Sequence, residues 1–127
     1  MTNAQEVVEK FLGSLGPTYD DMLKSVTDQT TDDFVWQNSG LPTCNGQAEA
    51  ISFLEQFAKS FSMASIKIDI VAIGSAGNVV VTERVDHFVD ANGQVLASLA
   101  LAGTLEVRDG KISAWRDYFD PRPLLSE

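Results

Sequence analysis

The second half of the chain alternates apolar and polar residues, which is typical of β-strands with one buried face and one solvent-exposed face. Strands are expected over residues 66–70, 79–89, 95–107 and 112–120. Short segments rich in glycine, asparagine and aspartate separate them, and Asn92-Gly93 is a strong hairpin signal. The pattern therefore predicts an antiparallel meander of long strands.

The first half of the chain repeats its apolar residues at helical spacing. A first helix is expected from an Asn3–Glu6 cap to Leu15, where Gly16-Pro17 stops the pattern. Two further helices are expected over residues 19–26 and 47–63, with a polar exit over residues 27–33 after the second helix. Between the helices, residues 34–38 form a short expected strand and residues 39–46 a turn-rich loop. This order predicts an α+β fold, with helices packed on one face of a curved sheet.

Composition limits the function classes. The 127 residues fit one domain over residues 1–127, and the net charge of −9 disfavours nucleic acid and anionic lipid as partners. No apolar segment approaches the roughly 20 residues that span a bilayer. Cys44 is the only cysteine, so no intrachain disulfide can form and a cytoplasmic protein is predicted. No metal-ligand spacing, phosphate loop or serine–histidine pattern is visible, so no metal or cofactor is expected.

Two charged residues inside an apolar strand carry the candidate chemistry. Arg84 and Asp86 are two positions apart, so their side chains share one face of the 79–89 strand. Asp117 lies between Trp115 and Phe119 on one face of the last strand. A buried carboxylate needs a proton or a cation, and Arg84 is the cation available on the same sheet. One guanidinium is therefore expected between two carboxylates.

This group has two explanations. A buried ionic network that only fixes strand register is consistent with the pattern. The alternative is a functional site, because two carboxylates that share one cation in a dry cavity tend to hold one proton, which makes one a base and the other an acid. His87 is the only histidine, and its side chain points away from Asp86, so it lies outside the group. The second explanation predicts acid–base chemistry on a small apolar molecule.

Three segments together resemble the limonene-1,2-epoxide hydrolase family. They are 82–86 (Thr-Glu-Arg-Val-Asp), 115–120 (Trp-Arg-Asp-Tyr-Phe-Asp) and 37–38 (Gln-Asn). The resemblance runs from the first helix to Pro121. It implies a cone-shaped fold of the nuclear-transport-factor-like type, in which helices on the concave side of a mixed or antiparallel sheet enclose a pocket. It also implies a homodimer that acts on a small hydrophobic epoxide and water.

The resemblance implies a role for each site residue. Asp117 matches the base that deprotonates water, Asp86 the acid that protonates the epoxide oxygen, and Arg84 the bridge between them. Asn38 matches the asparagine that helps to hold the water. Two residues before it the family has a tyrosine, whereas this chain has Trp36. An indole N–H can only donate, so Trp36 is expected to donate to the water oxygen from a different point.

The expected pocket wall is apolar and partly aromatic. Four residues match or neighbour the family's wall, and four more come from the predicted helices and the turn after them, where packing in the core is the alternative role. These eight residues are Phe88, Leu99, Leu101 and Phe119, with Met22, Phe57, Phe61 and Met63. The large aromatic groups predict a substrate different in shape from limonene oxide.

Epoxide hydrolysis is the leading hypothesis, and two others remain open at this point. The same fold could carry an isomerase or polyketide-cyclase reaction, which needs a base near an activated carbon and an oxyanion donor. A guanidinium bound to the base argues against that reaction. The third hypothesis is a non-catalytic module that binds a small hydrophobic ligand, and Trp36 in place of tyrosine motivates it.

Overall fold

The computed structural model describes residues 3–122. The helices and strands have the following order along the chain. The first are α1 (Ala4–Leu12), α2 (Tyr19–Gln29), β1 (Thr30–Asn38) and β2 (Cys44–Asn45). The longest helix, α3 (Gln47–Phe61), follows them. The last are β3 (Ser65–Ala76), β4 (Val79–Val89), β5 (Val95–Arg108) and β6 (Lys111–Tyr118).

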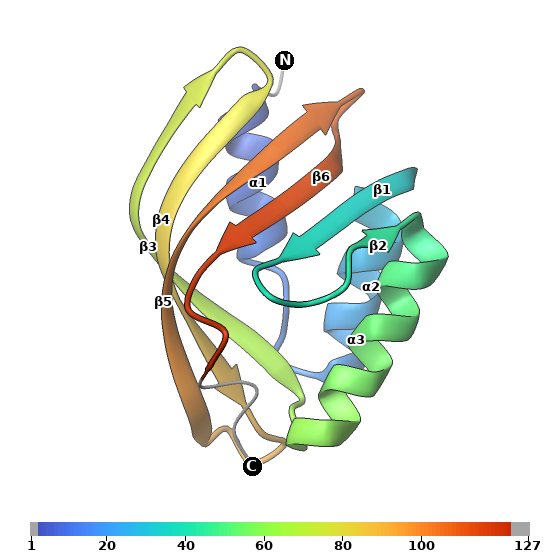
Figure 1. Cartoon of the computed structure of the whole chain (residues 1–127), viewed down its shortest axis with the longest axis vertical. Helices are drawn as coiled ribbons and strands as arrows, with labels where there is room; N and C mark the ends of the chain where they lie inside the picture. Colours follow the sequence, from blue (N-terminus) through green and yellow to red (C-terminus); the bar gives the residue numbers. More distant parts are fainter. Residues whose placement is uncertain (1–2, 123–127) are drawn as a thin grey trace.

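The strands form one curved sheet in the order β2-β1-β6-β5-β4-β3. All neighbouring pairs are antiparallel except β1 and β6, which run parallel. The sheet bends around the helices, and α3 faces its concave side across the molecule (Figure 1). The predicted α+β class with a mixed, curved sheet is confirmed.

Alternation along β4 separates the two faces of the sheet. Every second residue from Val80 to Phe88 is buried on the concave side, and the residues between them are exposed or half-buried. Burial of these side chains against the helices is the main term that stabilises such a layered fold. At the other end of the chain, Asn3 and Glu6 form the predicted capping box of α1. Among the described residues, no helix is long and apolar enough to cross a membrane.

Several boundaries differ from the sequence prediction. The strand predicted over residues 66–70 is β3, which runs from Ser65 to Ala76 and so includes part of the predicted turn. The predicted polar exit over residues 27–33 instead completes α2 and begins β1. Thr30 makes this junction abrupt, because its hydroxyl donates to the Val26 carbonyl at 2.6 Å and accepts from Gln47 Nε2 at 2.8 Å. The predicted loop over residues 39–46 contains the short strand β2, which pairs with Val35 and Trp36. Helix α1 ends at Leu12, short of the predicted Leu15.

Candidate active site

Arg84 is the centre of the polar group on the concave face of the sheet. Its strand places it inward between Thr82 and Asp86, and its side chain is completely buried. Nε donates to Asp86 Oδ1 at 3.2 Å, and Nη2 donates to Asp86 Oδ2 at 2.9 Å. The same-face pair predicted from their spacing therefore forms a fork-like ion pair.

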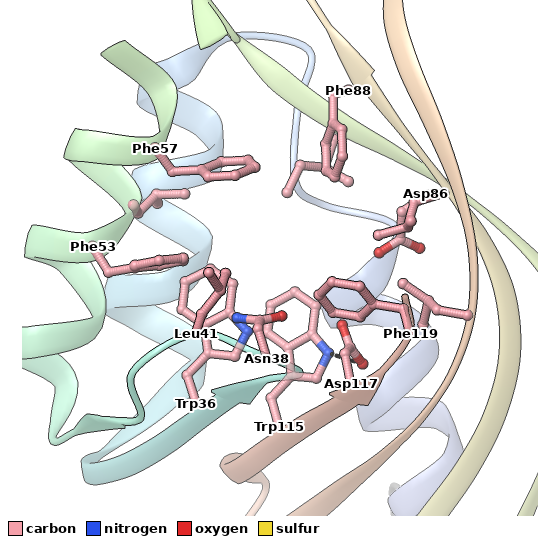
Figure 2. A pocket seen from close by; sticks show the side chains of 14 residues that line it. Trp36, Asn38, Leu41, Phe53, Phe57, Asp86, Phe88, Trp115, Asp117 and Phe119 are labelled. Carbon is pink, nitrogen blue, oxygen red and sulfur yellow. Dashed lines mark hydrogen bonds between the residues drawn. The ribbon is translucent and has the colours of Figure 1, made fainter. Parts of the chain in front are cut away.

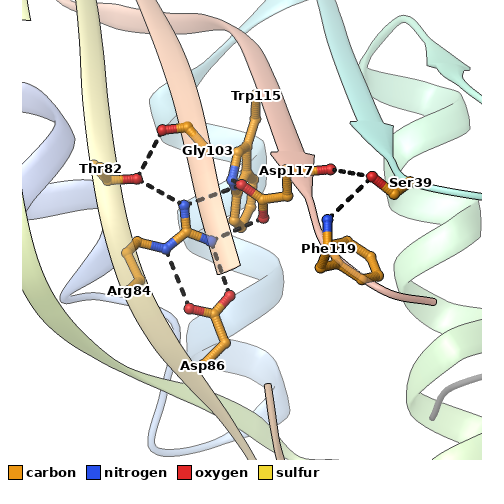
Figure 3. A network of polar contacts seen from close by, with 8 residues as sticks. All are labelled: Ser39, Thr82, Arg84, Asp86, Gly103, Trp115, Asp117 and Phe119. Carbon is orange, nitrogen blue, oxygen red and sulfur yellow. Dashed lines mark hydrogen bonds and ion pairs between the residues drawn. The ribbon is translucent and has the colours of Figure 1, made fainter. Parts of the chain in front are cut away.

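Asp117 reaches the same guanidinium from β6. Arg84 Nη1 donates to Asp117 Oδ1 at 3.0 Å, and Nη2 donates to Asp117 Oδ2 at 2.8 Å (Figure 3). Trp115 adds a third hydrogen bond, because its indole Nε1–H donates to Asp117 Oδ1 at 2.9 Å. Asp117 Oδ1 thus accepts two hydrogen bonds from the protein, and Oδ2 accepts one. Oδ2 keeps more free accepting capacity.

Thr82 completes the set of partners around Arg84. Nη1 also donates to Thr82 Oγ1 at 3.1 Å, and that hydroxyl donates to the Gly103 carbonyl at 2.9 Å. Strand register explains the meeting, because Gly103 of β5 lies opposite Thr82 of β4 and opposite Asp117 of β6. All five N–H donors of Arg84 are therefore used, and the guanidinium has one fixed orientation.

Burial and charge set the protonation behaviour of the group. Burial raises the pKa of Asp117, the charge and hydrogen bonds of Arg84 lower it, and the nearby Asp86 raises it, with a net pKa above the usual aspartate value. For Arg84, burial acts to lower the pKa, but hydrogen bonds and charge from Asp117 and Asp86 outweigh it. Arg84 therefore stays positively charged, and Asp117 is a stronger base than an ordinary aspartate.

A narrow, mostly apolar cavity lies between α3 and the concave face of the sheet, with both carboxylates at one side (Figure 2). The volume open to the centre of a water molecule is about 40 Å³. Its wall consists of Trp36, Asn38, Leu41, Phe53, Leu54, Phe57, Ile66, Asp86, Phe88, Leu99, Leu101, Trp115, Asp117 and Phe119. The cavity is therefore roomy enough for water to reach the two carboxylates.

Five of the eight predicted wall residues line this cavity. They are Phe57, Phe88, Leu99, Leu101 and Phe119. The other three do not line it, and the prediction is corrected for them. Met22, a residue of α2, is fully buried in the core, and Met63 is buried just after the end of α3. Phe61 lies one turn beyond Phe57 at the end of α3, where its side chain is exposed to solvent.

Asn38 and Trp36 lie on the inner face at the end of β1, where both line the cavity. The parallel register places Trp36 opposite Trp115 and Asn38 opposite Asp117. The two indoles stack with ring centroids 4.9 Å apart and planes 10° apart. Trp36 is 5% exposed, and among the described residues its Nε1–H has no hydrogen-bond partner.

Several residues of the site were not predicted as site residues. Phe53, Leu54 and Leu41 line the cavity, and Trp115 and Gly103 shape the surroundings of Asp117. The spacing of Trp115 and Asp117 on one face was a usable signal for their hydrogen bond. The sequence pattern contains no comparable signal for Gly103, since its role depends on how β5 aligns with β6.

His87 lies outside the group, as its strand position predicts. Its two ring nitrogens lie 2.7 Å from Ser98 Oγ and 2.8 Å from Asp69 Oδ2, on the outer face of the sheet. Within residues 3–122, no three histidine, cysteine, aspartate or glutamate side chains gather in a way that could hold a metal ion. The polar centre of the cavity therefore consists of the carboxylates, the guanidinium and their donors.

Comparison with known proteins agrees with this geometry. The family model of the limonene-1,2-epoxide hydrolase catalytic domain matches residues 2–127. Epoxide hydrolase EphG of Mycobacterium tuberculosis is 31% identical over 113 residues, which cover 89% of this chain and 70% of that protein.

Solved structures extend the comparison to the fold. The structure of an M. tuberculosis epoxide hydrolase of the same type has a TM-score of 0.73 and 30% identity, and covers 92% of this chain and 78% of its own. An NTF2-like protein of unknown function from Burkholderia pseudomallei has a TM-score of 0.76 at 17% identity, covering 98% and 96% of the two chains, and shows the shared fold alone. The chain belongs to the limonene-1,2-epoxide hydrolase family.

Proposed function

We propose that this protein adds water to a small, slim hydrophobic epoxide and releases a vicinal diol, in one acid–base step without a cofactor. The observation that carries the proposal is the Arg84 guanidinium, which is hydrogen-bonded to both Asp86 and Asp117 at one side of an apolar cavity. Membership of the epoxide hydrolase family supports it. A buried ionic network that only fixed the alignment of the strands would not need a cavity beside it.

Asp117 is the base in this reaction. A water beside Asp117 Oδ2 gives that oxygen a proton while the water oxygen forms a bond to an epoxide carbon. The carbon–oxygen bond of the ring breaks, and the epoxide oxygen takes a proton from the Asp86 carboxyl. One proton enters the group and one leaves it, so its charge is unchanged. Arg84 keeps the two carboxyls apart and oriented throughout.

The walls of the cavity indicate the substrate class. Five aromatic residues, Trp36, Phe53, Phe57, Phe88 and Phe119, line the cavity. Four of them form two edge-to-face pairs, Trp36 with Phe53 and Phe57 with Phe88. Such walls stack against flat groups, and the narrow space excludes bulky saturated rings. An epoxide that carries a flat aryl or unsaturated substituent fits best.

The test is a panel of terpene, cyclic and aryl epoxides in ¹⁸O-labelled water. We expect a diol that contains one labelled oxygen, and Asp117→Asn should lower its formation by at least about 100-fold, the usual contribution of a general base. Asp69→Asn is the matched control, because that aspartate lies on the outer face beside His87. Absence of diol from every epoxide in the panel would remove the proposal.

An isomerase reaction on the same fold is less consistent with the site. A base that shuttles protons between carbons needs freedom to move, whereas Asp117 is held by three hydrogen bonds. Exchange of the α-protons of a ketone, followed by NMR, separates the two reactions.

We further infer that the protein acts in the cytoplasm as a homodimer. The family resemblance and an exposed apolar area on the outer face of the sheet support the dimer, and the single cysteine, Cys44, fits a reducing compartment. The oligomeric state of the protein in solution tests the homodimer.

A further inference from the structure

The parallel strands β1 and β6 carry the same short pattern side by side. Trp36 is followed after one residue by Asn38, and Trp115 is followed after one residue by Asp117. The strands are in register at both positions, and the two indoles stack nearly parallel. Each tryptophan therefore stands in the same relation to the polar side chain two residues after it.

On β6 this relation produces a hydrogen bond, from Trp115 Nε1 to Asp117 Oδ1 at 2.9 Å. On β1 the corresponding donor, Trp36 Nε1, is buried without a partner among the described residues. Asn38 lies two residues after Trp36 on the same face of β1, and both side chains line the cavity (Figure 2). An indole N–H can only donate, so the Asn38 atom that faces it has to be an acceptor for the pair to be satisfied.

We propose that Asn38 Oδ1 accepts the Trp36 indole N–H, and that this contact turns Asn38 Nδ2 towards the cavity beside Asp117. The oxygen and nitrogen of a carboxamide have nearly the same shape, and rotation by half a turn exchanges them, so the hydrogen-bond network decides the orientation. Trp36 is then a positioning residue that acts through Asn38.

This orientation gives the water site a direction, and here the inference rests on the proposed function. Asp117 Oδ2 accepts one proton of the water, and Asn38 Nδ2 donates to one lone pair of its oxygen. The second lone pair is left for the epoxide carbon. With the amide turned the other way, Asn38 Oδ1 would accept a hydrogen bond from the water instead of donating one to its oxygen. Trp36 therefore does not contact the water itself. It orients Asn38, which holds the water.

The hydrogen bond can be tested in the resting protein, independently of turnover. The chain has two tryptophans, so a ¹⁵N–¹H spectrum contains two indole signals, which Trp36→Phe assigns. We expect Asn38→Ala to shift the Trp36 signal and to speed its hydrogen exchange by about 10-fold or more, while Asn38→Asp, which retains an acceptor, keeps it protected. The Trp115 signal, bound to Asp117, is the internal control. A Trp36 signal that Asn38→Ala leaves unchanged overturns the proposal.

A double-mutant cycle tests the consequence for the reaction. Trp36→Phe keeps the stacked ring but removes the donor, and should lower kcat by about 10- to 100-fold with little change in KM. In the Asn38→Ala background the same substitution should have almost no further effect, because its action passes through Asn38. Independent, multiplying effects of the two substitutions would contradict this route. If the wild-type protein forms no diol, the proposed function fails, and the NMR result still decides the hydrogen bond.

Discussion

Gly103 contributes to the site by having no side chain. A Cβ atom at this position would lie 2.1 Å from Asp117 Oδ1 and 2.9 Å from Arg84 Nη1. Both distances are far shorter than van der Waals contact, and both neighbours are held by several hydrogen bonds, so neither can move away freely. The close approach of β5 is thus a condition for the guanidinium to reach both carboxylates.

Gly103→Ala should therefore disturb the Arg84–Asp117 contact. We expect diol formation to fall by at least about 100-fold, because small displacements of reacting groups have large effects on rate. Overpacking should also destabilise the protein by about 1–3 kcal/mol. Kinetics and thermal unfolding measure both effects. Gly74→Ala is the matched control, since a Cβ at that strand position meets nothing within 4 Å. Equal activity of the two variants would contradict the role of Gly103.

The raised pKa of Asp117 makes a prediction about activity and pH. Asp117 must be ionised to accept a proton from water, so activity should fall as the pH falls through its pKa. Burial places that pKa above the usual aspartate value of about 3.9. We expect the acid limb of kcat to lie above pH 4. A limb at or below pH 4 would show that burial does not control this carboxyl.

The raised pKa of Asp117 also makes the folded state less stable as the pH rises. Because the pKa of Asp117 is raised in the folded state, the native protein binds more protons than the unfolded chain over the interval between the two pKa values. This contribution to stability is fully present below about pH 4 and is lost as the pH rises through the folded pKa. Denaturant unfolding at several pH values should show a weaker decline in Asp117→Asn than in the wild type. Parallel curves would contradict the assignment.

At the scale of residues, alternation along a strand was sufficient to predict which charges meet. Arg84 and Asp86 share a face by spacing alone, and Asp117 between two aromatic residues implied a buried carboxylate that needs a cation. Gly103 could not be predicted in this way. Its function depends on the alignment of β5 with both β4 and β6, and hydrophobic pattern does not specify alignment to one residue.

At the scale of elements, the pairing of β1 with β6 brings together the residues of the proposed water site. These strands are far apart in the sequence, and their parallel contact brings Asn38 beside Asp117. The antiparallel meander from β3 to β6 was predictable, because short turns connect its strands. Turn signals carry no information about a pair of strands that no turn joins, so the parallel pair was not predicted.

Helix α3 forms the aromatic side of the cavity and should control substrate size. Phe57 lies in the wall, 5.5 Å from Phe88 between ring centroids. Phe57→Ala should raise the turnover of a bulky epoxide relative to a slim one by about 10-fold. Phe61→Ala is the control, because that side chain lies outside the cavity on the same helix. Competition between two epoxides measures the ratio, and an unchanged ratio in Phe57→Ala would place the substrate elsewhere.

At the scale of the whole molecule, the outer face of the sheet carries a group of exposed apolar residues around Glu83. Val71, Val81, Val85, Ala100 and Ala102 line one shallow hollow across β3, β4 and β5. Val71 and Val81 are among the most exposed large hydrophobic residues described. Exposed apolar areas are often interfaces, and a second copy of the chain is the partner that we propose for this one.

Val81→Arg should therefore reduce the apparent mass in light scattering from that of a dimer to the 13.8 kDa of one chain. Burial of a charge in an apolar interface without a partner is costly, which is why association should fail. Val95→Arg serves as the control, because Val95 is similarly exposed but begins β5, opposite Val89 at the far end of β4. A wild-type protein of single-chain mass would contradict the dimer.

Ser39 fastens the end of β1 to β6 without touching either carboxylate. Its N–H donates to the Asp117 carbonyl at 3.1 Å. Its hydroxyl donates to the same carbonyl at 3.3 Å and accepts from the Phe119 N–H at 3.1 Å (Figure 3). A slip of one residue would turn Asn38 to the outer face. The loop from Gly40 to Thr43 follows this fastening point, so its length can change without moving the water site. Leu41 lines the cavity, so new loops here offer a way to alter the entrance while preserving the acid–base group.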